Sequence, residues 1–328
     1  MIVAHADWSV DPGKRWLATA RRDGAGWRVA APVPVGDAAG LIDRVAEWAD
    51  GAPAVLGLDL PIGLPRDYAR RHACALTPEF PAFLRGLTDP AFFRVAAAIE
   101  EVGPARPFYP ARGAAGMARA PHAAALGLAD TAALLRRCDR AVAGRRAAAP
   151  LFWTLGPQQV GKAALHAWEF VLQPALMGPA PPGLWPFAGT LEALLTPGAL
   201  VICEVYPADA LRQLGLKMAG SKRRQPDRAA LAAPLRAAMR ALGAAPDRAL
   251  AAMIADGFGA EATGEDRFDS VIGLLGMLGV LSGHRSDGVP DDAWVRSWEG
   301  WILGLDAPDD SAGITDTAPP LARVPSPG

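Results

Sequence analysis

The sequence predicts an α/β protein with a mixed sheet that begins in the order β-β-β-α-β and carries flanking helices. Two observations predict this class. Three strand-like segments follow one another at the start of the chain, separated by the turn sequences DPGK and DGAG. A segment with helical spacing and a continuous apolar run come next, and a second apolar run follows much later.

The first three strands are predicted from short apolar or alternating runs. They are MIVAHAD at residues 1–7, RWLATARR at 15–22 and GWRVAAPV at 26–33. The helix is predicted over 38–50, where Leu41, Ile42, Val45 and Trp48 recur at helical spacing. The fourth strand is the apolar run AVLGLDLPIGLP at 54–65, which Pro61 closes and which is typical of a strand buried on both faces.

The rest of the chain divides by composition. Residues 66–150 are rich in Ala and Arg, are broken by Pro and Gly and lack strand-like runs, so we predict a helical insertion. The apolar run ALVICEVYP at 199–207 predicts a second buried strand. Helices are predicted at 157–177, 245–258 and 266–283, the last apolar almost all round and therefore buried. We predict a single domain over 1–305, closed by WEGWIL, and a flexible tail over 306–328.

Composition excludes several classes of protein. Hydrophobic residues make up 51% of the chain and charged residues 20%, as in a globular protein. The three cysteines are far apart, which fits reduced thiols, and the start has no basic signal-peptide region, so we predict a cytoplasmic location. The longest apolar run, VIGLLGMLGVL, is too short to cross a membrane.

Charge is close to balanced overall but uneven along the chain. The net charge is −1, so no global attraction to nucleic acid is expected. Residues 208–250 are nevertheless basic and the chain after 251 is acidic. Solvated helix faces are the better explanation for most of these charges, and the arrangement also suits an anionic polymer beside a metal site.

Four acidic residues interrupt apolar surroundings: Asp7, Asp59, Glu204 and Asp269. A buried carboxylate without a partner costs several kcal/mol, so each needs a cation, a hydrogen-bond donor or a proton. A shared pair of divalent cations would satisfy all four, and Mg²⁺ or Mn²⁺ would suit their oxygen ligands. We therefore predict that these four residues bind metal.

Each carboxylate also has an ordinary structural explanation. Asp7 can cap the turn that follows it, Asp59 can accept from nearby backbone N–H groups, and Glu204 can pair with an arginine. The sequence TGED fits a capping box with Thr263 as N-cap and Asp266 three residues later, so we assign Asp266 to the helix start. Asp269 needs no such explanation.

Two further segments predict phosphate contacts. GSKRRQPDR offers Ser221 and Lys222, with its two arginines expected on an exposed loop. LGPQQVGKAAL matches a phosphate-binding loop from Gly156 to Lys162, except that Ala163 replaces the Ser or Thr that would hold magnesium. Pro157 also removes a backbone donor and suits the start of a helix, so we prefer a helix start in which Lys162 contacts substrate.

Taken together, these residues resemble the predicted RNase H-like nucleases known as domain of unknown function family 429. The similarity rests on GKRWLATA after Asp7, LDLPIGLP, EVYPADAL, SKRR, DRFDSVIGLL and EGWIL, in the family's order over residues 1–305. The resemblance implies an RNase H-like core in which Asp7, Asp59 and Asp269 converge on metal, with Glu204 as fourth member. Ser270, where Ala is expected, and the long 66–150 insertion depart from the pattern.

The expected function is a metal-dependent phosphodiester hydrolase acting on nucleic acid, with Asp7 bridging two Mg²⁺ or Mn²⁺ ions and Lys222 neutralising the phosphate. Two alternatives stay open. One is a non-catalytic or small-ligand RNase H-like module, related to the sugar-kinase fold and binding a small phosphorylated ligand. The other is a P-loop nucleotide binder acting through Gly156–Lys162.

Overall fold

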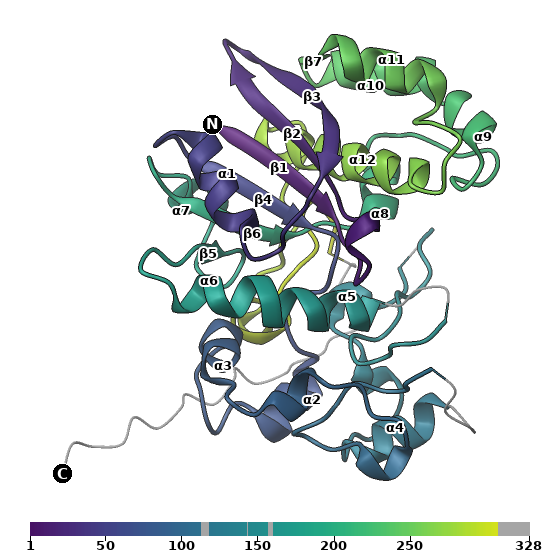
Figure 1. Cartoon of the computed structure of the whole chain (residues 1–328). Helices are drawn as coiled ribbons and strands as arrows, with labels where there is room; N and C mark the ends of the chain where they lie inside the picture. Colours follow the sequence, from purple (N-terminus) through teal and green to yellow (C-terminus); the bar gives the residue numbers. More distant parts are fainter. Residues whose placement is uncertain (113–117, 143, 157–159, 308–328) are drawn as a thin grey trace. The chain divides into compact units, whose positions relative to one another are not determined.

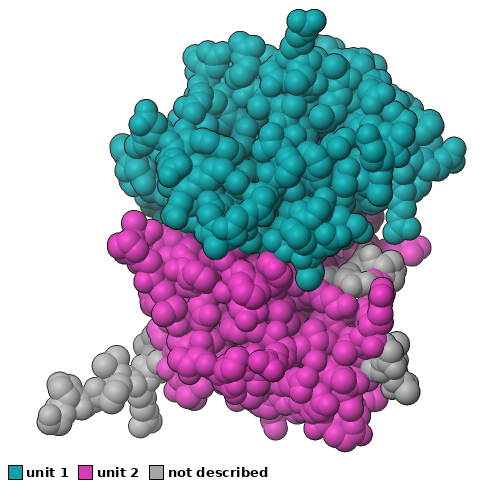
Figure 2. Space-filling model, in the orientation of Figure 1, with its two compact units in different colours: residues 1–60, 190–289, 302–306 teal, residues 61–189, 290–301, 307–328 magenta. Residues whose placement is uncertain are grey.

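The computed structural model describes residues 1–112, 118–142, 144–156 and 160–307 (Figure 1). The chain forms an α/β structure that divides into two compact units, coloured separately in Figure 2. Unit 1 comprises residues 1–60, 190–289 and 302–306, and unit 2 comprises residues 61–189, 290–301 and 307–328. The predicted insertion over 66–150 falls within unit 2, and the predicted tail over 306–328 lies outside the described residues from 308 on.

Unit 1 is built on a mixed sheet with the strand order β6-β4-β1-β2-β3-β7. The first three strands form an antiparallel meander, β4 runs parallel to β1, and β6 runs parallel to β4. The predicted β-β-β-α-β start and the later apolar strand are thereby confirmed. The strands of this sheet are β1 (Ile2–Asp7), β2 (Trp16–Asp23), β3 (Gly26–Pro34), β4 (Ala54–Leu58), β6 (Leu200–Glu204) and β7 (Ala244–Pro246).

Helices cover the sheet of unit 1. Helix α1 contacts β1 and β4, whereas α12 contacts the four strands β1 to β4, and every residue of β1 is buried. Although α12 is buried along most of its length, no helix within the described ranges is long and apolar enough to cross a membrane. The helices of unit 1 are α1 (Leu41–Ala49), α7 (Leu191–Leu194), α8 (Pro207–Gln213), α9 (Gln225–Ala229), α10 (Ala232–Ala241), α11 (Arg248–Asp256) and α12 (Gly264–Leu281).

Strand β7 was not predicted. Its residues Ala-Ala-Pro have little strand propensity, and the sequence pattern assigned two of them to the helix expected over 245–258. In the structure they pair in parallel with β3, and the helix begins later, at Arg248. Asp247 caps that helix by accepting a hydrogen bond of 2.7 Å from the backbone N–H of Leu250. The pairing with β3 is a tertiary contact, which local sequence does not encode.

Unit 2 contains helices joined by long irregular segments, and aromatic side chains form its core. Phe108 packs against Phe92, Phe152 and Trp168 with ring centroids 5.8, 5.2 and 6.3 Å away. Among the described residues between 66 and 150 only isolated bridges and no strands occur, as predicted. The α- and π-helices and the strand of unit 2 are α2 (Arg66–His72), α3 (Phe80–Gly86), α4 (Arg119–Ala125), α5 (Val160–Ala167), a π-helical turn (Trp168–Leu172), α6 (Gln173–Met177), β5 (Gly183–Leu184) and a second π-helical turn (Val295–Glu299). Short 3-10 helices lie at Pro90–Phe93, Ile99–Glu101, Ala132–Leu134 and Arg137–Asp139.

Half-buried arginines tie the insertion of unit 2 to residues 290–301. Arg66 forms ion pairs of 2.5 and 2.9 Å with Asp292 and Glu299, and Arg137 pairs with Asp292 at 2.8 Å. Arg136 donates to both carboxylate oxygens of its neighbour Asp139, at 2.9 and 3.0 Å. Charge pairing therefore explains why a late segment of the chain completes unit 2.

Glycines let α12 approach the sheet closely. At Gly273 a Cβ atom would overlap the imidazole ring of His5, which is fully buried on β1. The His5 Nδ1–H donates to the carbonyl of Ser270 at 2.9 Å, and burial lowers the pKa of His5 to about 4, so the ring is neutral at pH 7. At Gly276 a Cβ atom would lie 2.7 Å from the Cβ of Ala210 in α8.

Gly273→Ala should destabilise the protein, because the buried His5 ring is held by its hydrogen bond and cannot move aside. We expect the free energy of unfolding in urea to fall by about 1–3 kcal/mol, the usual effect of overpacking. Gly279→Ala is the matched control in the same helix, since the nearest atom to its new Cβ is 3.8 Å away. The control should keep or gain stability. Equal stability of the two variants would contradict the close approach at Gly273.

Candidate functional site

The register of two parallel strands brings Asp7 and Asp59 together. Ala6 on β1 lies opposite Leu58 on β4, so the residues that follow them, Asp7 and Asp59, are neighbours at the same edge. The backbone N–H of Asp59 donates to the carbonyl of Ala6 at 3.1 Å, which extends the ladder past the end of β4. The side chains of Asp7 and Asp59 are hydrogen-bonded to each other, which requires that they share a proton.

Helix α12 supplies Asp269 to the same place. His5 and Asp7 are two residues apart on a strand and face the same side of the sheet. Gly273 and Asp269 are four residues apart on a helix and share one face. Because Gly273 rests on His5, Asp269 is directed toward Asp7, and both carboxylates are buried, at 7% and 8% exposure.

The three carboxylates raise one another's pKa values. Burial raises the pKa of Asp7 well above its usual range, and the charges of Asp269 and Asp59 raise it further. Burial and Asp269 raise the pKa of Asp59 to about 7, against the opposing effects of Lys222 and of the hydrogen bond from Asp7. The proton that the two carboxyl groups share belongs to the pair and not to either residue alone. At neutral pH the cluster carries less negative charge than three carboxylates would.

Lys222 supplies the positive charge of the site. Its ammonium forms an ion pair with Asp269 and a second one, of 3.4 Å, with Glu265. The charges of Asp269, Asp59 and Glu265 raise the pKa of Lys222 above its usual value despite partial burial. The side chain is nearly half exposed, so the ammonium lies between the buried carboxylates and solvent. The predicted contact of Lys222 with a phosphate stays a prediction. In the structure its ammonium is paired with the Asp269 carboxylate.

Arg228 holds the backbone that carries Lys222, a role that no sequence signal indicated. The guanidinium is buried and donates to the carbonyls of Gly257 at 2.8 Å, Gly259 at 2.6 Å and Lys222. These three bonds join the loop before α9 to the segment between α11 and α12. Arg228 therefore fixes the loop of Lys222 relative to the helix of Asp269.

The assignment of Asp266 to a capping box is wrong. Thr263 has helical backbone angles, φ −74° and ψ −4°, and its side chain makes no capping hydrogen bond. Asp266 instead joins the acidic cluster, where burial, Glu265 and Asp269 raise its pKa to about 6 while Lys14 opposes the rise. The sequence does indicate this placement, because Asp266 and Asp269 are three residues apart and residues at that spacing share a helix face.

The structure does not bring Glu204 to the other acids. Glu204 is the last residue of β6 and lies opposite Leu58, so its side chain points to the same face as Leu58. Asp59 is the next residue along and points to the other face. The Glu204 charge still raises the pKa of Asp59, but Asp7 and Asp269 respond to other groups. Glu204 is buried beside the cluster without being part of it.

Two predicted substrate-binding residues remain, Ser221 in unit 1 and Lys162 in unit 2. The hydroxyl of Ser221 accepts a local hydrogen bond of 3.4 Å from the Arg223 N–H, and its own N–H donates to Asp227. Lys162 is half-buried on α5 of unit 2.

The structure does not show, over residues 151–155, the strand that must precede a P-loop. Residues 151–155 form a turn and one isolated bridge, whereas a P-loop follows a strand. A Cβ at Gly161 would lie 2.5 Å from the carbonyl of Leu151, so this glycine serves helix packing. The predicted helix over 157–177 is observed from Val160, and residues 157–159 lie outside the described part of the chain.

The unit 1 site thus combines a proton-sharing aspartate pair, a third aspartate bound to a lysine ammonium, and a buried arginine that holds the lysine loop. Such an arrangement can hold a cation or a proton and can present an ammonium to an anion. Comparisons with protein-family models, with curated proteins and with solved structures gave no match to this chain.

Proposed function

We propose that unit 1 has an RNase H-like core and that its carboxylate site serves a metal-dependent phosphodiester hydrolase acting on nucleic acid. The strand arrangement supports the first part, because an antiparallel β1-β2-β3 meander is extended beside β1 by the parallel strands β4 and β6. This is the arrangement that the family resemblance implies. Fold alone does not assign chemistry, so the support for this activity comes from the residues of the site.

The observation that carries the proposal is the convergence of Asp7, Asp59 and Asp269 from two strands and a helix. Three buried or half-buried acids side by side destabilise a fold unless a cation or protons neutralise them. Their pKa values stay raised although Lys222 is present, so one ammonium does not balance the cluster. Strongly perturbed groups of this kind are typical of functional sites.

The donor set fits a divalent cation. Asp7, Asp59 and Asp269 offer carboxylate oxygens, which Mg²⁺ and Mn²⁺ accept as ligands. Among the described residues, oxygens of all three do not lie within 4.8 Å of one another, so a shared ion requires Asp269 to turn from Lys222. When bound, such an ion lowers the pKa of a coordinated water and neutralises phosphate charge.

The chain's own groups supply the remaining functions. Asp7 and Asp59 give up their shared proton when a cation replaces it. Lys222, released from Asp269, offers its half-exposed ammonium to a phosphate oxygen. Arg223 and Arg224 follow in the same loop with exposed side chains, and each pairs with an acid at 3.7 Å, Arg223 with Glu265 and Arg224 with Asp227. A nucleic-acid backbone would compete with these exposed pairs for the two guanidinium groups.

A small-ligand module without catalysis is the second candidate, and one observation favours it. Lys222 already pairs with Asp269, so the site contains a cation of its own. In that case a small phosphorylated ligand would bind at Lys222 without a divalent ion. The response of the protein to Mn²⁺ separates the two candidates.

Asp7→Asn should stabilise the protein at pH 8 in the presence of a chelator. Raised pKa values mean that the folded state binds more protons than the unfolded state between about pH 4 and 7, so stability falls as pH rises through this window. The amide keeps a donor for Asp59 and removes the charge. We expect a gain of about 1–3 kcal/mol at pH 8 that shrinks toward zero at pH 4, measured by urea unfolding.

The exposed Asp43 on α1 provides a matched control for this measurement. Asp43→Asn should change stability by less than about 0.5 kcal/mol at either pH. An Asp7→Asn variant that is less stable than the wild type at pH 8 would show that the carboxylates are satisfied without a cation.

Mn²⁺ should raise the melting temperature of the wild type, and more at pH 8 than at pH 6 because protons compete with the ion. The Asp7→Asn and Asp269→Asn variants should lose this response, and Asp43→Asn should keep it. With Mn²⁺ present, the wild type should cleave labelled single- or double-stranded DNA or RNA, and both site variants should lose activity at least about 100-fold.

Two results would reject the hydrolase. The first is an equal Mn²⁺ response in the wild type and Asp7→Asn. The second is a Mn²⁺ response without cleavage of any of the four nucleic acids, which would favour the small-ligand module. Because Asp7→Asn is expected to fold more stably than the wild type at pH 8, unfolding does not confuse the comparison.

A further inference from the structure

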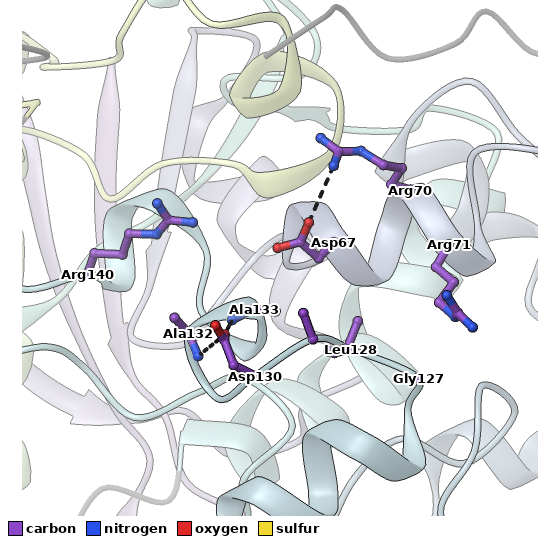
Figure 3. A pocket seen from close by; sticks show the side chains of 10 residues that line it. Asp67, Arg70, Arg71, Gly127, Leu128, Asp130, Ala132, Ala133 and Arg140 are labelled. Carbon is purple, nitrogen blue, oxygen red and sulfur yellow. Dashed lines mark hydrogen bonds and ion pairs between the residues drawn. The ribbon is translucent and has the colours of Figure 1, made fainter. Parts of the chain in front are cut away.

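Unit 2 contains a pocket of its own that the proposed function does not use. The pocket has a volume of about 690 Å³, within the range of small-molecule sites, and is shown in Figure 3. One wall is α2, which contributes Asp67, Arg70 and Arg71, and another is formed by residues 127–133. Arg140 lies on the side opposite Arg70 and Arg71 (Figure 3).

Among the charged side chains that line the pocket, two arginines have no acidic partner within the described residues. Arg70 pairs with Asp67 at 3.5 Å and lies over the ring of Trp294, 5.1 Å from its centroid. Within the described residues, the guanidinium groups of Arg71 and Arg140 form no ion pair or hydrogen bond, and the Nε of Arg140 is buried without a partner. An unpartnered buried guanidinium nitrogen is costly, which favours an anion beside it.

The acidic residues of the pocket are already engaged. Asp130 accepts hydrogen bonds of 2.8 and 3.0 Å from the N–H groups of Ala132 and Ala133, so it shapes the loop. Asp67 is neutralised by Arg70. Neither carboxylate is therefore positioned as a counter-ion for Arg71 or Arg140.

The loop is built to accommodate Arg71. Gly127 has φ +68°, a conformation that favours glycine, and a Cβ there would lie 2.6 Å from the Nε of Arg71. The guanidinium of Arg71 consequently lies against the loop. Leu128 and Ala133, each 7% exposed, give the pocket apolar lining beside its cations. Apolar walls with a few charged groups are typical of sites for small organic ligands.

We infer that this pocket binds a small organic anion, whose phosphate or carboxylate oxygens pair with the guanidinium groups of Arg140 and Arg71 on its two sides while its apolar part contacts Leu128 and Ala133. The planar guanidinium fork matches both phosphate and carboxylate oxygens, so these two chemistries share the same recognition. The inference is independent of the carboxylate site in unit 1.

Calorimetric titration of the whole chain with inorganic phosphate, adenosine monophosphate and citrate tests the inference. At least one probe should bind, and adenosine monophosphate should bind more tightly than inorganic phosphate if the apolar lining contributes. Preference for citrate over both phosphates would identify carboxylate as the bound group. Arg140→Gln and Arg71→Gln should each weaken binding at least tenfold, and Arg140→Lys should weaken it less than Arg140→Gln.

Arg146→Gln, an exposed arginine outside the pocket, is the matched control and should bind as the wild type does. Asp7→Asn should also bind normally, so failure of this inference is distinct from failure of the hydrolase. Arg71 is exposed, so its variant should fold even if Arg140→Gln does not. No binding of any probe, or equal binding by the wild type and Arg71→Gln, would overturn the inference.

Discussion

Helix α12 lies against β1 at Gly273, where the absence of a side chain makes room for the ring of His5. This contact sets the distance between the helix and the strand, and the hydrogen bond from His5 to the Ser270 carbonyl sets their register along each other. Asp7 is two residues beyond His5 and Asp269 four residues before Gly273. The distance between Asp7 and Asp269 thus depends on the packing of Gly273 against the neutral ring of His5.

The carboxylate site works against the stability of the fold that holds it. Apolar side chains at Asp7 and Asp269 would pack in the same space without raised pKa values or an ion pair to Lys222. Sites that reduce stability in this way are expected where activity needs them. Arg228 also costs stability, because burial removes water from its guanidinium and lowers its pKa. In return its hydrogen bonds fix the loop that carries Lys222.

Much of unit 1 could be predicted because its elements have local signals. Strands β1 to β4, β6 and helices α1 and α12 follow from periodicity and apolar runs. Their observed ends lie within about three residues of the expected ones, except that β4 ends at Leu58 and not at residue 65. Strand β7 could not be predicted, since only its pairing with β3 makes it a strand. The three acids that meet were recognised as polar residues in apolar surroundings.

Glu204 has the same sequence signature as Asp59 but faces the opposite side of the sheet. Which face a residue takes depends on how β6 is offset against β4, and neither segment encodes that offset. Asp266 was misassigned for a different reason, since a four-residue motif was preferred to its spacing from Asp269. Arg228 had no local signal, because its partners are backbone carbonyls distant in sequence.

The division of the chain has a consequence for the order of folding. Arg66 and Arg137 belong to the first half of the sequence, whereas Asp292 and Glu299, which neutralise them, come near its end, after most of unit 1. During synthesis these arginines are made long before their partners, so unit 2 cannot complete its charge pairing until Asp292 and Glu299 have been made. Neither unit is a continuous stretch of sequence, so neither can complete its fold before residues beyond 289 have been synthesised.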